Sequence, residues 1–290
     1  MTAAVLRPAR EEEIREAAHL FITSVTDLAA RNGLAAPLYT MASIEPVYRH
    51  IHRTGIFEVA ELDGQMVAIC HAIVRDHQWF LSGFWALPGF QKKGLGGPLL
   101  ARVREQGEAR GARLRFTWSS VDLTAMATYM KQGMLPGFQI LTFAGSPTSL
   151  PEPDPSFEEG PLDPALAGDL DLGIRGVRRA VDHTFWQTNP LAGRLVVKRG
   201  RPVGYHYASG GMIGPVGWLG AEDGAGVIAL ALRAARTGAE SIRVPIPGKN
   251  HVAVRAALGA GLRLVAFSHL LCTEEPGAMD RYIPSGPSLF

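Results

Sequence analysis

A glycine-rich turn is the part of the chain whose residue types and spacing could do chemistry. It lies within FWALPGFQKKGLGGPLL, Phe84 to Leu100, after an apolar strand-like run and before an apolar helix-like run. Because Gly94, Gly96 and Gly97 have no side chains, several backbone N–H groups can converge where the helix dipole favours negative charge. The turn is therefore predicted to bind an anion such as phosphate. The alternative is that the glycines only allow the backbone to make the turn.

Three kinds of phosphate-binding loop can be compared with this turn. A Walker loop needs lysine directly after its second glycine, but Leu95 follows Gly94. A dinucleotide-binding fingerprint needs a small third residue, where this chain has Leu99. The pattern of glutamine or arginine, two residues, glycine, one residue and glycine is the one that fits, with Gln91, Gly94 and Gly96.

With this loop the chain resembles the GNAT superfamily of acyl-CoA-dependent N-acetyltransferases. Pro88 stands three positions before Gln91, where the family commonly has Val-x-Pro. DLTAMATYMKQGM is similar to the family pattern N-x-x-A-x-x-L-Y-x-x-x-G-F, with Ala125, Tyr129 and Gly133 in register. The departures from that pattern are Asp122, Thr128 and Met134. The resemblance covers roughly the first 145 residues well and the second half only in outline.

The resemblance implies a cofactor, acetyl-CoA or another acyl-CoA. Its pyrophosphate would lie on the N–H groups from Lys92 to Gly97, and its pantetheine arm would pair with the backbone of the preceding strand. The two lysines could meet the remaining phosphate charge, or contribute little as flexible surface residues. The implied cofactor-binding residues are Trp85, Ala86, Leu87, Gln91, Lys92, Lys93, Gly94, Leu95, Gly96 and Gly97.

The resemblance also implies a general acid, at Tyr129. A phenol keeps its proton at neutral pH and can place it on the departing thiolate; the alternative is a helix tyrosine that only packs on the sheet. The strand before the loop, WFLSGFWAL, lacks the glutamate that many members use as base. Glu58, His71, Asp76 and His77 are the candidates on neighbouring strands, although His71 is expected to be a hydrogen-bonded core residue, and a base is not required for an amine that binds uncharged.

The elements of the first half alternate between strands and helices. Asp63-Gly64 is the commonest sequence signal for a tight hairpin turn. Apolar periodicity predicts further elements on both sides of this hairpin. They are a strand ending near Arg7, a helix containing Ile14 to Val25, a strand from Trp79 to Leu87, a helix from about Gly97 to Ala109, a strand in ARLRFTWSSV and a helix in LTAMATYMKQGM.

The second half repeats this plan in degraded form. LVVKRGRPVG matches the hairpin VAELDGQMVA, and NHVAVRAALGAGL matches DLTAMATYMKQGM. Trp85 and Trp218 each precede the corresponding helix. The second copy is six residues shorter at the glycine turn, has Glu222 and Asp223 in place of the lysines, and has Ala257 in place of the tyrosine. We expect the two carboxylates to cap the helix that follows, and the second copy to bind no CoA.

The predicted fold is α/β (α+β): two tandem GNAT-like domains, each a mixed, mostly antiparallel sheet flanked by helices. The first domain spans residues 1–145, a proline-rich linker residues 146–164, and the degenerate second domain residues 165–290. VDHTFWQTN, Val181 to Asn189, either lines a pocket between the domains or packs as a helix. The second domain is expected to buttress the first and to close one side of the acceptor cleft, with RYIPSGPSLF free to reach the interface.

Composition excludes several classes of function. The 290 residues carry a net charge of +2, with 47% hydrophobic and 19% charged residues and no block of like charge, which argues against a nucleic-acid partner. We expect no secretory signal or membrane span from this sequence. Cys70 and Cys272 read as reduced thiols, so we expect a cytoplasmic protein. His50 and His52 lack a third ligand, so no metal is expected.

The predicted activity is transfer of an acetyl group from acetyl-CoA to an amine, in a small molecule or a peptide. The rival hypothesis is a non-catalytic acyl-CoA-binding or regulatory module that keeps the cofactor loop. The sequence does not identify the acceptor, the acyl chain length or the oligomeric state.

Overall fold

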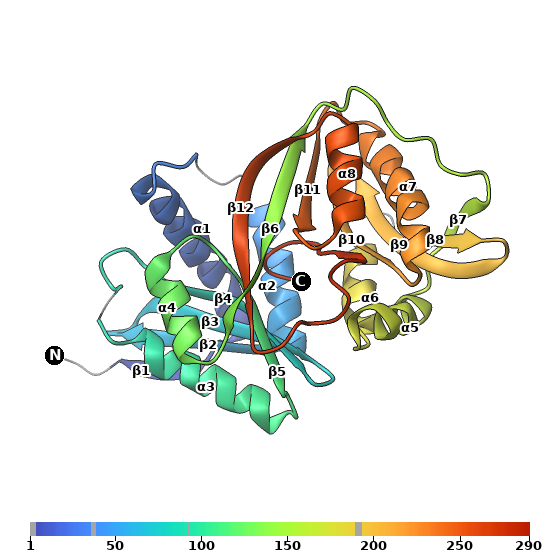
Figure 1. The fold of residues 1–290 in the computed structure, drawn as a ribbon. Coiled ribbons are helices and arrows are strands. Elements are labelled where there is room, and N and C mark those ends of the chain that lie inside the picture. Colours follow the sequence, from blue (N-terminus) through green and yellow to red (C-terminus); the bar gives the residue numbers. More distant parts are fainter. Residues whose placement is uncertain (1–3, 36–38, 92, 189–192) are drawn as a thin grey trace. The chain divides into compact units, whose positions relative to one another are not determined.

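The computed structural model describes residues 4–35, 39–91, 93–188 and 193–290 (Figure 1). The chain divides into two compact units. Unit 1 consists of Met1–Thr117 and Asp122–Gln132, and unit 2 of Trp118–Val121 and Gly133–Phe290.

Unit 1 is a mixed α/β unit whose strands follow the order β1-β2-β3-β4-β5. The neighbours pair antiparallel, except that β4 and β5 are parallel. Its elements are β1 (Val5–Pro8), η1 (Glu11–Glu13), α1 (Ile14–Arg31), α2 (Met41–Thr54), β2 (Ile56–Leu62), β3 (Gln65–Arg75), β4 (Gln78–Ala86), α3 (Gly96–Ala109), β5 (Leu114–Ser119, whose last two residues belong to unit 2) and α4 (Leu123–Lys131).

Helices cover both faces of the unit 1 sheet. Trp85 contacts Phe21 of α1 at a ring distance of 5.1 Å, and His71 contacts Tyr48 of α2 at 4.5 Å. The alternate face carries Glu58, whose carboxylate is bonded to side chains of α3. Because successive strand residues point to opposite faces, β4 presents one set of side chains to α1 and α2 and the other to α3 and α4.

The two predicted hairpins are confirmed, one in each unit. At the first turn Asp63 has φ 51° and Gly64 φ 79°, and at the second Arg199 has φ 51° and Gly200 φ 76°. Two successive residues with positive φ form the tight turn whose twist matches the flanking strands. These matching turns fix the register between the two copies of the repeat.

Unit 2 is also a mixed, mostly antiparallel sheet flanked by helices. Its strand order is β12-β6-β11-β10-β9-β8-β7, with β13 paired to β10. Its elements are β6 (Leu135–Gly145), β7 (Phe157–Pro161), α5 (Pro164–Arg175), α6 (Ala180–Thr188), β8 (Gly193–Lys198), β9 (Arg201–Ser209), β10 (Met212–Trp218), η2 (Ala221–Asp223), α7 (Gly224–Arg236), β11 (Ile242–Pro247), α8 (His251–Gly259), β12 (Arg263–Cys272) and β13 (Tyr282–Ile283).

The compact units do not follow the predicted domain boundaries. β6 lies inside the predicted first domain, yet it pairs antiparallel with β11 and β12 and belongs to unit 2. The predicted linker is not wholly irregular, because Phe157–Pro161 forms β7 against β8 and Pro164 begins α5. Strand pairing, which joins residues far apart in the sequence, places β6, and composition cannot predict it.

The segment VDHTFWQTN forms α6 up to Thr188, and Asn189 lies outside the described residues. His183 is fully buried, with its Nε2 2.8 Å from Asp171 Oδ2 and its Nδ1 3.0 Å from the Tyr207 hydroxyl. The His183 side chain is therefore used in packing α6 within unit 2. Helix packing is one of the two predicted alternatives.

The segment RYIPSGPSLF is not free, contrary to the prediction. Tyr282 and Ile283 form β13 on β10, and both are buried. Leu289 and Phe290 are buried as well, and the Phe290 carbonyl accepts a hydrogen bond from Arg175 (3.2 Å). Apolar burial thus holds this segment within unit 2.

Candidate functional site

The candidate site of unit 1 begins where β4 parts from β5. The parallel ladder joins Gln78 to Leu114 and ends at Leu81 and Thr117, although β4 continues to Ala86. On its other side, the pairing of β4 with β3 shifts by one residue, so that Ser82 forms a β-bulge. A bulge bends a strand and increases its twist, which separates the end of β4 from its parallel neighbour.

The released part of β4 turns the backbone groups of alternate residues away from β3. The Leu87 N–H donates to the Val67 carbonyl on β3 (2.9 Å). Because hydrogen-bonded and non-bonded pairs alternate along an antiparallel ladder, Trp85 also faces β3, whereas Phe84 and Ala86 direct their N–H and C=O groups away from it. The pairing of pantetheine with Trp85, Ala86 and Leu87 stays a prediction. In this register the Phe84 N–H and C=O and the Ala86 N–H point away from β3, whereas the Ala86 carbonyl accepts from Ser24 and Gln91.

The loop after β4 returns to the strand through the side chain of Gln91. Its Nε2 donates to the Ala86 carbonyl (3.2 Å), and its Oε1 accepts from Arg31 of α1 (3.2 Å). The glutamine of the predicted loop pattern thus fastens the loop to β4 and α1. Lys93 lies over the ring of Phe90 at 4.7 Å. Lys92 lies outside the described residues.

The loop leads into an open helix start. Gly89 and Gly94 have φ angles of +86° and +81°, which favour glycine. α3 begins at Gly96, Leu95 is its N-cap residue, and no side chain among the described residues caps it. The first N–H groups of a helix have no partner within the helix, so those at Gly96 and Gly97 can receive an anion.

The two glycines at the start of α3 have different surroundings. A Cβ on Gly96 would stand 2.7 Å from Phe84 Cζ, so this position is needed for packing against the β4 side chain. A Cβ on Gly97 would meet no atom of the described residues within 4 Å. Gly97 is therefore the position at which a substitution tests ligand binding without disturbing the fold.

Tyr129 lies on the face of the sheet that carries α3 and α4. Its ring centroid is 6.3 Å from that of Phe84, and Asp122 caps α4 by accepting hydrogen bonds from the N–H groups of Thr124 (2.9 Å) and Ala125 (3.1 Å). Burial raises the pKa of the Tyr129 phenol well above its usual range, with smaller contributions from Cys70 and Asp122. The phenol therefore keeps its proton at neutral pH and is a donor there.

Three of the four candidate bases are poorly placed. The Glu58 carboxylate accepts from Arg102 Nε (2.6 Å) and Gln106 Nε2 (2.7 Å), so both its oxygens are engaged. Asp76 and His77 form the exposed turn at the other end of β4. That strand has nine residues, so the turn lies about 30 Å from the glycine loop.

His71, the fourth candidate, lies directly beside the bulge of β4. A Cβ on Gly83 would stand 2.3 Å from His71 Nε2. Contrary to the prediction, neither ring nitrogen has a hydrogen-bond partner within the described part of the chain. The ring is fully buried and stacks on Phe57 at 4.6 Å. Burial lowers the pKa of His71 from 6.5 to about 3, so the imidazole is neutral at pH 7.

Acidification is expected to destabilise the protein through His71. The pKa of His71 is lower in the folded than in the unfolded chain. The contribution of the neutral ring to the free energy of unfolding is therefore fully present above pH 6.5 and is lost as the pH falls toward 3. At pH 5 the loss is about 2 kcal/mol. Urea unfolding at pH 7 and pH 5 should therefore show a smaller drop in His71→Leu than in the wild type. Equal drops in the two proteins would contradict the buried neutral imidazole.

The described residues hold no group of three His, Cys, Asp or Glu side chains that could bind a metal ion. Cys70 is buried and Cys272 half-buried, and both are free thiols. No helix within the described ranges is long and apolar enough to cross a membrane.

Comparison with known proteins relates this part of the chain to a known family. Residues 25–134 match the family described as the acetyltransferase (GNAT) family. The match includes β4, the glycine loop, α3 and α4. The predicted resemblance to GNAT acetyltransferases is thereby confirmed for the part of the chain that carries the candidate site. None of the curated protein sequences matches the chain.

Solved structures extend the likeness to the whole chain. A protein from Pyrococcus horikoshii assigned as an acetyltransferase superimposes with a TM-score of 0.78 at 15% identity, covering 100% of this chain and 97% of that chain. A GCN5-related N-acetyltransferase from Sphaerobacter thermophilus gives 0.62 at 17% identity, covering 93% and 95%. A tandem GNAT protein from the clavulanic acid biosynthesis pathway gives 0.61 at 12% identity, covering 93% and 98%. The fold is therefore that of GNAT proteins, tandem examples included, as predicted.

Proposed function

We propose that the protein is an acyl-CoA-dependent N-acyltransferase whose catalytic site lies in unit 1 and binds acetyl-CoA or another acyl-CoA. One observation carries the proposal. β4 parts from β5 after Leu81 and leads, through a glycine loop, into α3 (Figure 1), whose start has no side-chain cap among the described residues. This arrangement offers a strand edge for an amide-containing arm and a helix N-terminus for its phosphates.

The cofactor would lie along the free edge of β4. Its pyrophosphate would accept hydrogen bonds from the N–H groups at the start of α3, including those of Gly96 and Gly97. Its pantetheine amides would pair with Phe84 and with the Ala86 N–H, since the Ala86 carbonyl already accepts from Ser24 (3.1 Å) and Gln91 (3.2 Å). The thioester would then approach the face on which Tyr129 lies.

The proposed reaction is direct transfer to an amine. The nitrogen lone pair attacks the thioester carbonyl carbon, an N–C bond forms, and the C–S bond breaks. Tyr129 donates its proton to the departing thiolate, the proton that the amine nitrogen gives up passes to water, and the Tyr129 phenolate takes a proton back from water. His71 lies beside the bulge, but burial lowers its pKa to about 3 and makes it a weak proton acceptor, so the amine is proposed to enter uncharged and to need no base.

The acceptor is proposed to be an amine of a small molecule or a peptide. The near-neutral charge argues against a nucleic-acid partner. The free thiols Cys70 and Cys272 support a reducing compartment, and we propose the cytoplasm. No membrane partner is proposed.

A second function is favoured by the engagement of Glu58 with Arg102 and Gln106. With the Glu58 carboxylate engaged, unit 1 could bind acyl-CoA without transferring the acyl group, as a binding or regulatory module. This alternative retains the loop and the edge of β4 but gives no role to the Tyr129 hydroxyl.

A panel of amines would separate the two functions. Acetyl-CoA and the full chain would be incubated with small-molecule and peptide amines, and the release of free thiol measured against a control without the protein. Acceptor-dependent thiol release, with acetylated amine detected by mass spectrometry, would support the transferase. Calorimetric CoA binding with no acceptor-dependent release would support the binding module, and absence of CoA binding would exclude both.

One CoA is expected to bind per chain, because the segment before α7 does not repeat the glycine loop of unit 1. Glu222 and Asp223 place two carboxylates just before α7, where the repeat in unit 1 has its glycine loop. The prediction that the Asp223 side chain caps α7 is wrong. The carboxylate pairs instead with Lys198 (2.7 Å). Ala257 replaces the tyrosine. Calorimetric titration of the full chain with CoA should give a stoichiometry near one, and a value near two would contradict this expectation.

A further inference from the structure

Unit 2 contains a counterpart of the strand edge at which we place the cofactor in unit 1. Equivalent backbone hydrogen bonds in the two units show which residues correspond. In unit 1 the Leu87 N–H donates to the Val67 carbonyl (2.9 Å), and in unit 2 the Leu219 N–H donates to the Val203 carbonyl (2.8 Å). The two valines lie three positions after the corresponding turn glycines. Leu219 is therefore the counterpart of Leu87, β10 of β4, and β11 of β5.

This register corrects the match of the two tryptophans. Trp218 pairs with Gly204, as Ala86 pairs with Ala68 in unit 1, so Trp218 is the counterpart of Ala86 and not of Trp85. A shift of one residue moves a side chain to the other face of a sheet. Trp218 accordingly lies against Gly224 of α7, whereas Trp85 lies against Phe21 of α1.

The edge that is free in unit 1 is occupied in unit 2. β10 and β11 are paired only at Met212 and Arg243. Beyond that point β13 pairs antiparallel with β10, with Ile283 opposite Val216 and Tyr282 opposite Gly217. The Trp218 N–H, the counterpart of the free Ala86 N–H, donates to the Arg281 carbonyl (3.2 Å).

Asn250 fastens this segment to the start of α8. Its Oδ1 accepts from the Ala253 N–H (3.0 Å), and its Nδ2 donates to the Tyr282 carbonyl (3.2 Å). Asn250 is fully buried. Its counterpart Asp122 caps α4 in the same way, but an ionised carboxylate has no N–H to donate. Only unit 2 has a strand, β13, at this place. An asparagine at position 250 and an aspartate at position 122 fit that difference.

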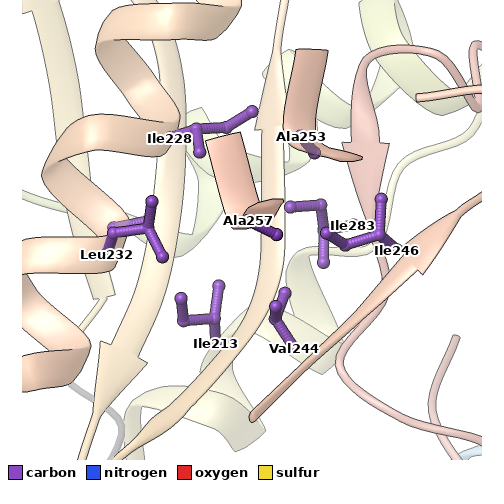
Figure 2. Close-up of a pocket in the computed structure, with 9 residues that line it drawn as sticks. Ile213, Ile228, Leu232, Val244, Ile246, Ala253, Ala257 and Ile283 are labelled. Carbon is purple, nitrogen blue, oxygen red and sulfur yellow. The ribbon is translucent and has the colours of Figure 1, made fainter. Parts of the chain in front are cut away.

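The side chain of Ile283 fills part of the space beside the missing tyrosine. In Figure 2 Ile283 and Ala257 border the same small apolar pocket. Ala257 stands where unit 1 has Tyr129. The side chains around the pocket come from β10, α7, β11, α8 and β13, and are those of Ile213, Ile228, Ala231, Leu232, Val244, Ile246, Ala253, Ala257 and Ile283.

We propose that Arg281–Ile283, here called the plug segment, permanently occupies the cleft of unit 2 that corresponds to the acyl-CoA cleft of unit 1. The plug segment supplies peptide N–H and C=O groups and an apolar side chain where, under the proposed function, unit 1 receives the pantetheine arm. It is a part of the unit 2 core and not a lid over a second ligand site. The comparison with pantetheine rests on the proposed function, whereas the occupancy itself does not.

Amide hydrogen exchange provides a paired test in the full chain. Without CoA, the Trp218 N–H should exchange at least 100-fold more slowly than its counterpart Ala86 N–H, because only Trp218 has a backbone acceptor in the described structure. Saturating CoA should slow exchange at Ala86 and leave Trp218 unchanged. Fast exchange at Trp218, or slowing there by CoA, would overturn the plug. Failure of CoA to protect Ala86 while Trp218 remains slow would count against the cofactor site of unit 1 and support the plug.

A substitution in the plug segment distinguishes a core element from a lid. Ile283→Asp places a charge among the apolar side chains of the pocket, so exchange at Trp218 should accelerate at least tenfold, while Ile283→Val should change it little. CoA stoichiometry should stay at one in both variants. Unchanged exchange in Ile283→Asp, or the appearance of a second CoA site, would overturn the proposal. Should Ile283→Asp fail to fold, the wild-type comparison of Trp218 with Ala86 still decides the occupancy.

Discussion

Replacing Gly97 by aspartate is expected to weaken acyl-CoA binding about 100-fold while unit 1 remains folded. An added Cβ meets no described atom within 4 Å, and a carboxylate in the first turn is favourable for the helix dipole. The same carboxylate would lie where we place the pyrophosphate. Two unit charges about 6 Å apart repel by about 3 kcal/mol at an effective dielectric constant of 20, which weakens binding about 100-fold. Calorimetry with CoA measures the affinity, and thermal unfolding measures the fold.

Two neighbouring variants serve as controls for Gly97→Asp. Gly97→Ala adds a methyl group without charge, so CoA affinity should fall much less than in the aspartate variant. Gly96→Ala would bring its Cβ 2.7 Å from Phe84 Cζ, so this variant should lose thermal stability even without ligand. Unaltered CoA affinity in a folded Gly97→Asp protein would show that α3 does not receive the phosphates.

Removing the hydroxyl of Tyr129 is expected to lower kcat about 100-fold, the lower part of the range for general acid catalysis, because water can protonate the thiolate in part. The ring that packs near Phe84 is kept in Tyr129→Phe, so the affinity for CoA should not change. Because burial raises the phenol pKa, loss of the Tyr129 proton should not lower the wild-type rate between pH 7 and 9. Thiol release with a good acceptor measures kcat at each pH.

Thr128→Ala is the matched control on the same helix. The Thr128 hydroxyl is exposed and donates to the Thr124 carbonyl (2.9 Å), so its removal should leave kcat unaltered. An equal decrease in both variants would indicate a disturbed α4 and no specific role for the phenol. If Tyr129→Phe keeps its full single-turnover rate, Tyr129 is not the acid.

Local sequence signals determined much of unit 1. The turn at Asp63-Gly64, the cap at Asp122 and the glycines before α3 act through neighbouring backbone groups, so residue type and spacing predict them directly. The order of the motifs was sufficient to indicate the GNAT class and the loop that we propose binds CoA. The correspondence of the two hairpins was likewise readable, because each needs two adjacent residues with positive φ.

Pairings between distant segments were decided only by the tertiary structure. The sequence did not predict the bulge at Ser82 or the register of β4 on β3, which turns the backbone groups of Trp85 and Leu87 toward β3 and those of Phe84 and Ala86 away from it. It left Glu58 as a candidate base, because Arg102 and Gln106 reach it only when α3 packs on the sheet. Such contacts depend on register and packing, which no single segment encodes.

The division of the chain shows the same limit. β6 follows α4 directly in the sequence, yet its partners β11 and β12 lie about a hundred residues further along the chain. The stretch RYIPSGPSLF reads as a polar tail with two prolines, and only the ladder of Tyr282 and Ile283 with β10 makes part of it a strand. The sequence thus determined turns, caps and the glycine loop, whose causes are local. Tertiary structure decided strand partners, the exposed edge and the occupied second cleft, because backbone groups pair with whichever segment the whole fold brings to them.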